Sequence, residues 1–203
     1  MRRLGFLLII LAAIGTPATA EEPHLFRASS DHPQGQGRGH SNVRPSAAMM
    51  RPVLASLDRT DIEMMDTCLA ENHLARRDYA ALVRAVRFNA GPGRTLWYVA
   101  PVLRPFCLGL YGAHAFASFL VEERTAPARP RYRLFFQTRG DFFTVYRRLH
   151  HGLNDVETTG CTSNQCWDTR LAYDGNRYRP IRCTQTTFLN DRPTTERIRC
   201  QRQ

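Results

Sequence analysis

Residues 147–183 read RRLHHGLNDVETTGCTSNQCWDTRLAYDGNRYRPIRC, and this stretch decides the fold. Short runs of aromatic and β-branched residues alternate in it with turn formers, which is the pattern of strands separated by turns. Asp174-Gly175 is the sharpest turn signal, because this dipeptide suits a two-residue hairpin turn with positive φ. Cys161 and Cys166 lie symmetrically about Ser163-Asn164, so a two-residue turn there sets the cysteines opposite each other. We therefore expect two antiparallel hairpins here.

The remaining cysteines extend this argument. Cys183 and Cys200 lie symmetrically about the NDRP segment at residues 190–193, so a four-residue loop there would place them face to face. Opposed residues of an antiparallel pair have Cα atoms about 4.5–5.5 Å apart, a separation that a disulfide can bridge. Cys68 and Cys107 are then left to tie a helix to the sheet. The predicted disulfides are Cys161–Cys166, Cys183–Cys200 and Cys68–Cys107.

The strand pattern continues on both sides of this stretch. Upstream, the runs TLWYVAPVL, AFASFLVEE, RYRLFFQT and FFTVYRRL are rich in aromatic and β-branched residues, and turn formers separate them. Downstream, TQTTFL and TERIRC add two further runs. The spacing of about ten residues predicts an antiparallel meander of about seven to nine short strands.

Residues 57–86 carry helical signals instead. Thr60 and Glu63 have the spacing of a capping box, and Ile62, Met65 and Leu69 then recur at helical spacing. We expect one broken helix or two short ones. The predicted fold class is therefore α+β, with an N-terminal helical segment packed on a disulfide-stapled antiparallel sheet.

The beginning of the chain has the pattern of a secretory signal peptide. Arg2 and Arg3 precede the apolar run LGFLLIILAAI, and small residues end at Ala20, where we expect cleavage. The run is shorter than the roughly 20 residues that span a bilayer, and no later segment comes closer, so we expect no transmembrane segment in the mature chain. The predicted organisation is a signal peptide at residues 1–20, a disordered tether at residues 21–55 that is rich in turn formers, and a single α+β domain at residues 56–203.

Composition indicates the compartment and the class of partner. All six cysteines follow the predicted signal peptide, which fits an oxidising compartment, either a periplasm or the cell exterior. All 28 basic residues are arginine and the formal net charge is +10. Arginine pairs bidentately with carboxylates and phosphates, so an Arg-rich surface suits an anionic envelope component or a protein partner. Codon bias in a GC-rich genome would give the same composition, and nucleic acid is not the partner that we expect.

Two segments resemble the FG-GAP or VCBS-type hairpin units of secreted bacterial proteins. AVRFNAGPGRTLWYV, residues 85–99, resembles their loop-to-strand segment, in which an aromatic-x-x-Asn-Gly-Asp-Gly loop leads into a strand. LHHGLNDVET, residues 149–158, followed by LAYDGNRYRPIRC, is similar to the hairpins of their second half. Calcium-binding members carry several loop carboxylates, whereas residues 89–93 here carry none, so the resemblance implies degenerate units. We expect no metal and no cofactor.

His150, His151 and Asp155 are the candidate catalytic residues, with one histidine as general base and the aspartate as the carboxylate that orients it. Adjacent strand residues point to opposite faces, so only one histidine could serve a given site. The other interpretation is an exposed pair of turn histidines. A zinc site from Cys161, Cys166 and a histidine is disfavoured, because an exported thiol pair centred on a turn is more often a disulfide.

The sequence favours a non-catalytic exported protein that binds an envelope component or another protein. In that interpretation no residue is catalytic. The alternative is a small secreted hydrolase that uses His150 or His151 with Asp155.

Overall fold

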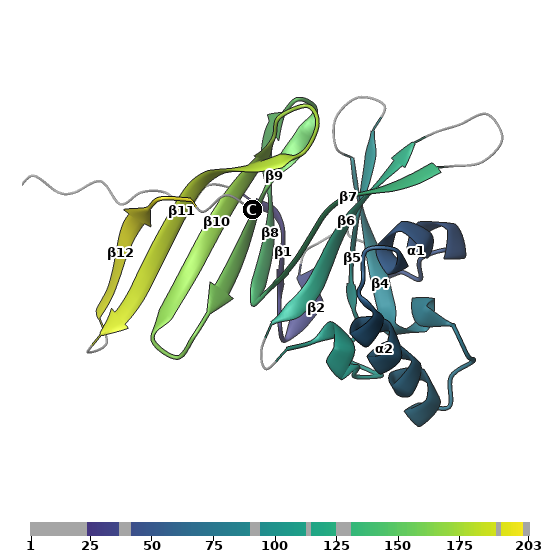
Figure 1. The fold of residues 1–203 in the computed structure, drawn as a ribbon. Helices are drawn as coiled ribbons and strands as arrows, with labels where there is room; N and C mark the ends of the chain where they lie inside the picture. Colours follow the sequence, from purple (N-terminus) through teal and green to yellow (C-terminus); the bar gives the residue numbers. More distant parts are fainter. Residues whose placement is uncertain are drawn as a thin grey trace, which may run out of the picture.

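The computed structural model of the chain describes residues 24–36, 42–89, 94–112, 115–124, 131–189 and 192–200. The predicted signal peptide lies outside these residues. Within them, the chain folds into two antiparallel β-sheets and two α-helices, and three disulfides join its cysteines (Figure 1).

The two sheets differ in size and in strand order. The smaller sheet contains, in spatial order, β3 (Asn42–Val43), β4 (Val83–Asn89), β5 (Thr95–Pro101), β6 (Phe116–Arg124) and β7 (Arg131–Gly140). The larger sheet contains, in spatial order, β12 (Arg192–Ile198), β11 (Tyr178–Leu189), β10 (Gln165–Tyr173), β9 (Leu153–Cys161), β8 (Phe142–His150), β1 (His24–Ser29) and β2 (His32–Gln36). The predicted antiparallel sheet is confirmed, but the described residues are mostly β and contain more strands than expected.

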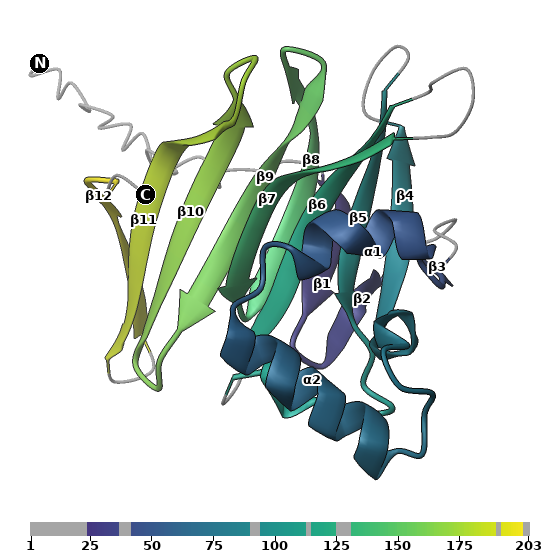
Figure 2. The same ribbon diagram turned by 45° about the vertical axis from the view of Figure 1, so that its right-hand side comes forward.

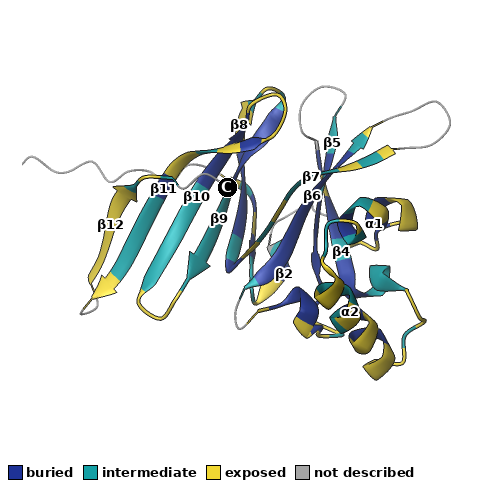
Figure 3. Cartoon of the chain, viewed as in Figure 1, coloured by how far each residue is buried: buried dark blue, intermediate teal, exposed yellow. Residues whose placement is uncertain are grey.

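Aromatic rings join the two sheets. The ring centroid of Phe26 lies 4.9 Å from that of Tyr98, which stacks on Phe143 at 5.0 Å. All three side chains are buried, and aromatic side chains dominate the energetics of such cores. Strand β12, by contrast, is almost wholly exposed (Figure 3). The core therefore lies between the sheets and includes Leu171 and Tyr173 at the end of β10 and Tyr178 at the start of β11. Strand β12 and the less buried halves of β10 and β11 extend beyond it (Figure 1).

Two helices lie on the side of the smaller sheet that faces away from the larger sheet (Figure 2), and α1 packs on β6 and β7. They are α1 (Ala47–Leu54) and α2 (Arg59–Glu71). The N-cap of α2 is Asp58, whose carboxylate accepts a hydrogen bond from the backbone N–H of Asp61 at 2.8 Å. The capping box predicted at Thr60 and Glu63 is therefore wrong. Aspartate is a strong N-cap residue, and Glu63 pairs instead with Arg59, with Nε and Oε1 2.6 Å apart.

The prediction of a disordered tether at residues 21–55 does not match residues 24–36 and 42–55, which form β1, β2, β3 and α1. The segment is polar overall, but its few large apolar side chains occupy the core. Phe26 is 1% exposed and Met50 is 3% exposed. Burial of these side chains against the sheets offsets the entropy cost of ordering the segment, and local composition does not reveal such tertiary contacts.

The three disulfides join the pairs that the sequence predicts. Cys161 and Cys166 lie directly opposite each other across the β9–β10 hairpin, with Cα atoms 4.1 Å apart. Cys183 bonds to Cys200, although its opposite residue in the ladder is Ile198. The predicted four-residue loop is wrong because Leu189 lies opposite Arg192, which leaves two residues between the strands.

The β10–β11 turn is longer than predicted. Tyr173 lies opposite Tyr178, so the connection has four residues, and the backbone N–H of Asp174 donates to the carbonyl of Arg177 at 3.0 Å. The carboxylate of Asp174 accepts from the N–H groups of Asn176 and Arg177, which stabilises this wider turn. Gly175 has a φ of +99°, the positive φ that the dipeptide predicts.

Candidate functional site

Exposed arginines gather at the end of the molecule where β6, β8 and β10 end and where β7, β9 and β11 begin, the upper end in Figure 1. We call this region the arginine-rich end and define it by Arg87, Arg124, Arg131, Arg133, Arg147, Arg148, Arg177 and Arg179. Arg124 and Arg131 lie directly opposite each other on neighbouring strands. Like charges in such a position repel, and the pairing of Arg124 with Glu122 offsets part of that repulsion.

Arg94 links the two sheets at this end. Its guanidinium contacts one carboxylate oxygen of the buried Glu122 through Nε at 2.9 Å and Nη2 at 2.7 Å. It also donates through Nη1 to the carbonyl of His151, 3.3 Å away. The same guanidinium lies over the rings of Phe135 and Tyr173, at 5.5 and 5.3 Å from their centroids. Arg94 therefore fixes the β8–β9 turn relative to the smaller sheet.

The carboxylate of Glu122 is shared by two arginines. Its second oxygen accepts from Nε of Arg124 at 2.6 Å. Since two guanidiniums pair with this one carboxylate, its negative charge is offset within the chain. The neighbouring Glu123 accepts a hydrogen bond from the indole N–H of Trp97 at 2.6 Å. The nearby carboxylates are thus already used within the chain, and the exposed charge of this end is positive.

The structure brings His150 and Asp155 together at the same end. Nδ1 of His150 lies 2.5 Å from Oδ1 of Asp155, which is fully buried. The other carboxylate oxygen lies 3.5 Å from Nη2 of Arg170, another buried residue. The His150 side chain is 32% exposed, so it is not the freely exposed turn residue that the second interpretation expects. A register shift in β8 between Val145 and Leu149 accompanies this arrangement.

The cluster continues along the outer face of the larger sheet. The guanidinium of Arg170 lies 3.2 Å from the ring centroid of Tyr146. The Tyr146 hydroxyl donates to Glu157 at 2.8 Å, and Glu157 also pairs with Arg182 at 3.3 Å. Burial, followed by the nearby Glu157 carboxylate, raises the pKa of the Tyr146 hydroxyl well above its ordinary value. The hydroxyl therefore stays protonated and remains a donor at neutral pH.

His151 takes no part in this cluster. It is exposed, it has a φ of +48°, and its carbonyl accepts from Arg94. In the part of the chain that the structure describes, no hydroxyl or thiol forms a hydrogen bond to His150. The geometry therefore provides an oriented histidine without an adjacent nucleophile.

Sequence reasoning missed the pair formed by Arg94 and Glu122. One signal was present, because Glu122 directly follows the apolar run FLV and a buried carboxylate requires a cationic partner. The partner itself could not be identified, since Arg94 lies on another strand connection.

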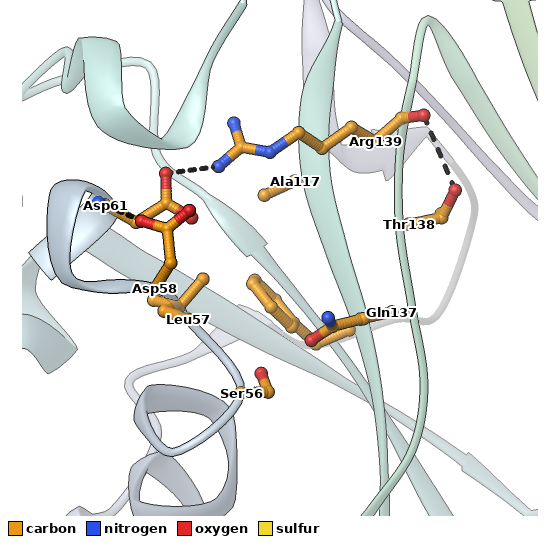
Figure 4. A pocket seen from close by; sticks show the side chains of 9 residues that line it. Ser56, Leu57, Asp58, Asp61, Ala117, Gln137, Thr138 and Arg139 are labelled. Carbon is orange, nitrogen blue, oxygen red and sulfur yellow. Dashed lines mark hydrogen bonds and ion pairs between the residues drawn. The ribbon is translucent and has the colours of Figure 1, made fainter.

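A cavity of about 320 Å³ lies between the α1–α2 connection and strands β6 and β7 (Figure 4). Its lining residues are Ser56, Leu57, Asp58, Asp61, Ala117, Phe119, Gln137, Thr138 and Arg139. Nη2 of Arg139 lies 2.7 Å from Oδ1 of Asp61 and 3.0 Å from the carbonyl of Gly109. The carboxylate of Asp58 caps α2. The lining contains two carboxylates and one guanidinium, so the cavity suits an anionic partner less well than the arginine-rich end does.

A second cavity, of about 340 Å³, lies beside β1 and the start of β8. It is lined by His24, Arg27, Ala28, Ser29 and Phe142. Neither cavity is lined by His150 or Asp155.

No group of three or more His, Cys, Asp or Glu side chains among the described residues could hold a metal ion. In the same ranges, no helix has the length and apolar character needed to cross a membrane. The chain matches no protein-family model, no curated protein and no solved structure. The resemblance to FG-GAP or VCBS-type units therefore stays a prediction.

Proposed function

We propose that this protein is an exported, non-catalytic binding protein that holds a phosphate-bearing glycan of the cell envelope at its arginine-rich end. The observation that carries the proposal is the distribution of charge. Exposed arginines crowd the ends of β6, β8 and β10. The nearby carboxylates are fewer and are paired within the chain: Glu122 and Asp155 are buried, and the exposed Asp174 pairs with Arg179. The three disulfides support a location outside the cytoplasm.

The chemistry of arginine supports a phosphate group as the recognised element. A guanidinium presents several N–H donors in a planar fork that matches phosphate oxygens bidentately. Arg133 lies 5.1 Å from the Phe135 centroid, on the ring that Arg94 also contacts. Stacking on a rigid ring restricts a long side chain and lowers the entropy that binding would cost. Arg147 and Arg148 stand near the end of β8 in the larger sheet, at the same end of the molecule. A polymer with repeated phosphates can therefore contact side chains of both sheets.

The proposal can be tested by removing charge at one end of the molecule only. Two double variants remove charge at the arginine-rich end: one is Arg147→Gln with Arg148→Gln, and the other is Arg131→Gln with Arg133→Gln. The control is the double variant Arg76→Gln with Arg77→Gln. The last pair is also adjacent and exposed, but it lies in the connection after α2. The probe is a glycerol-phosphate polymer, and the same polymer without phosphate is the control ligand.

Each variant at the arginine-rich end should weaken binding by about tenfold, equivalent to about 1.4 kcal/mol, and added salt should weaken it further because it screens exposed charges. The control variant should bind like the wild type. Equal losses in all three variants, or equal binding of the phosphate-free polymer, would contradict a localised phosphate site.

A second candidate function is favoured by one contact, that between Nδ1 of His150 and the buried carboxylate of Asp155. Such a carboxylate orients a histidine so that its other ring nitrogen can act as a general base. His151 provides a matched control, because it is the neighbouring residue and lacks this contact. Ester hydrolysis by the wild type that His150→Ala abolishes and His151→Ala preserves would establish a hydrolase and overturn the non-catalytic proposal. We expect no hydrolysis by any of the three proteins.

A further inference from the structure

Large apolar side chains are exposed at the end of the molecule opposite the arginine-rich end. In the connection between β5 and β6, Leu103 is 42% exposed, Phe106 is 54% exposed and Leu108 is 63% exposed. At the end of β11, Phe188 is 46% exposed and Leu189 is 61% exposed. We call these five residues the apolar end. Exposed apolar side chains that gather in groups mark interaction sites in folded proteins.

The β5–β6 connection is held firmly in place. Cys107 is buried and forms a disulfide with Cys68 of α2. The Phe106 ring stacks on that of Tyr111, with centroids 4.7 Å apart, and Leu110 is fully buried. Buried residues thus alternate with the exposed ones and anchor the connection. The exposed side chains are therefore presented by a rigid support, and binding would cost little ordering entropy.

The apolar residues come from both sheets. The first three follow β5 of the smaller sheet and the last two end β11 of the larger sheet, and both groups lie at the lower end in Figures 1 and 2. The β9–β10 hairpin, which turns between Cys161 and Cys166, reaches the same end. A groove in a protein partner would accept one protruding loop, whereas a flat surface can contact both groups of apolar residues at once. The separation of the two groups therefore favours a planar partner.

The charges beside these side chains indicate the chemical nature of the planar partner. Residues 101–112 contain Arg104 and no acidic residue. At the other group, Arg192 lies opposite Leu189 and follows Asp191 in the sequence, so the excess of positive charge belongs to the β5–β6 connection. Arginine beside leucine and phenylalanine is typical of segments that lie at the lipid headgroup boundary, where anionic lipids add electrostatic attraction. We infer that the apolar end docks on the surface of an anionic lipid bilayer, with Phe106 and Leu108 in the headgroup and upper acyl region.

The test is sedimentation of the purified full chain with vesicles. Vesicles that mix phosphatidylglycerol with phosphatidylcholine would be compared with vesicles of phosphatidylcholine alone. The variants are Phe106→Ser with Leu108→Ser, and Phe188→Ser with Leu189→Ser. The matched control is Leu149→Ser, because Leu149 is 47% exposed but lies at the arginine-rich end.

The wild type and Leu149→Ser should sediment with the anionic vesicles, and each double variant should lose about tenfold or more of that binding, as expected when one or two apolar side chains no longer leave water. Because Phe106 also packs on Tyr111, Leu108→Ser alone serves as a variant without a ring contact. It should show a smaller loss with an unchanged unfolding midpoint.

The result can be separated from that for the arginine-rich end. The variant with Arg147→Gln and Arg148→Gln should keep its binding to vesicles; if it loses this binding, the phosphate headgroups are held by the arginine-rich end and the inference is overturned. The variant with Phe106→Ser and Leu108→Ser should keep its binding to the glycerol-phosphate polymer. The inference is overturned if the wild type does not sediment with anionic vesicles, or if Leu149→Ser loses as much binding as the double variants. Reversible self-association without lipid that Leu108→Ser abolishes would also overturn it, because a second copy would then be the occupant.

Discussion

Replacement of Glu122 by glutamine should destabilise the protein by about 2–3 kcal/mol. The side chain is 4% exposed and it contacts Arg94, which is 25% exposed, and Arg124, which is 57% exposed. Breaking a fully buried ion pair typically costs about 3–5 kcal/mol, because the remaining charge is left without compensation. Arg94 retains some solvent and the glutamine keeps one acceptor oxygen, which together reduce the expected cost.

The assay is chemical unfolding at neutral pH with the disulfides intact, read as the change in midpoint at constant slope. The matched control is Glu63→Gln, which makes the same chemical change in an exposed pair with Arg59, where the side chains are 59% and 92% exposed. Such a surface pair contributes about 0.5 kcal/mol or less. The thermal midpoint of Glu122→Gln should fall by about 4–10 °C for a chain of this size.

Arg94→Gln should be destabilising as well, and the double variant should lose less than the sum of the two single losses, because the two residues share one interaction. The reasoning is refuted if Glu122→Gln is no more destabilising than Glu63→Gln. It is also refuted if the losses of the two single variants are simply additive.

Three further predictions concern the two hairpins at the arginine-rich end. Gly175→Ala should cost about 1 kcal/mol or more from its φ of +99° alone, since the new Cβ would lie 3.8 Å from its nearest contact; Gly160→Ala, with no atom within 4 Å, should be close to neutral in the same unfolding assay. His150→Ala should destabilise the fold by about 1–3 kcal/mol because Asp155 loses a buried partner, and His151→Ala should not; equal midpoints for the two would contradict this. The backbone N–H of Arg177, the Arg179 side chain and the N–H of Asn176 hold the pKa of Asp174 well below its ordinary value, so its stabilising contribution is present above about pH 4 and is lost as the pH falls. Thermal midpoints measured against pH should therefore decline less on the acid side for Asp174→Asn than for the wild type.

The hairpins and disulfides were predictable because their signals are local. The symmetric placement of Cys161 and Cys166 about a turn identifies both the hairpin and the bond, since few residues separate the two strands. The length of the β10–β11 turn was not predictable from its dipeptide alone. It depends on how the Asp174 carboxylate binds the following N–H groups.

The N-terminal strands and the site depended on distant contacts. Nothing in the neighbourhood of Phe26 predicts that it packs on Tyr98, since the two residues lie on different sheets. The charge of the arginine-rich end was visible only as composition until the strand order placed the arginines together. The sequence offered either His150 or His151 as the partner of Asp155. The structure selects His150, and because Asp155 is buried, the contact satisfies a carboxylate that has no access to water.

The pairing of β1 with β8 has a consequence for the order in which the chain can fold. Phe26 lies opposite Val145, so the first described strand has no partner on one side until much of the later sequence is present. Pairing between such distant segments closes a long loop and slows folding. A chain that emerges from its amino terminus onward keeps Phe26 exposed during that interval. The first strand can therefore complete its place in the sheet only after β8 is present.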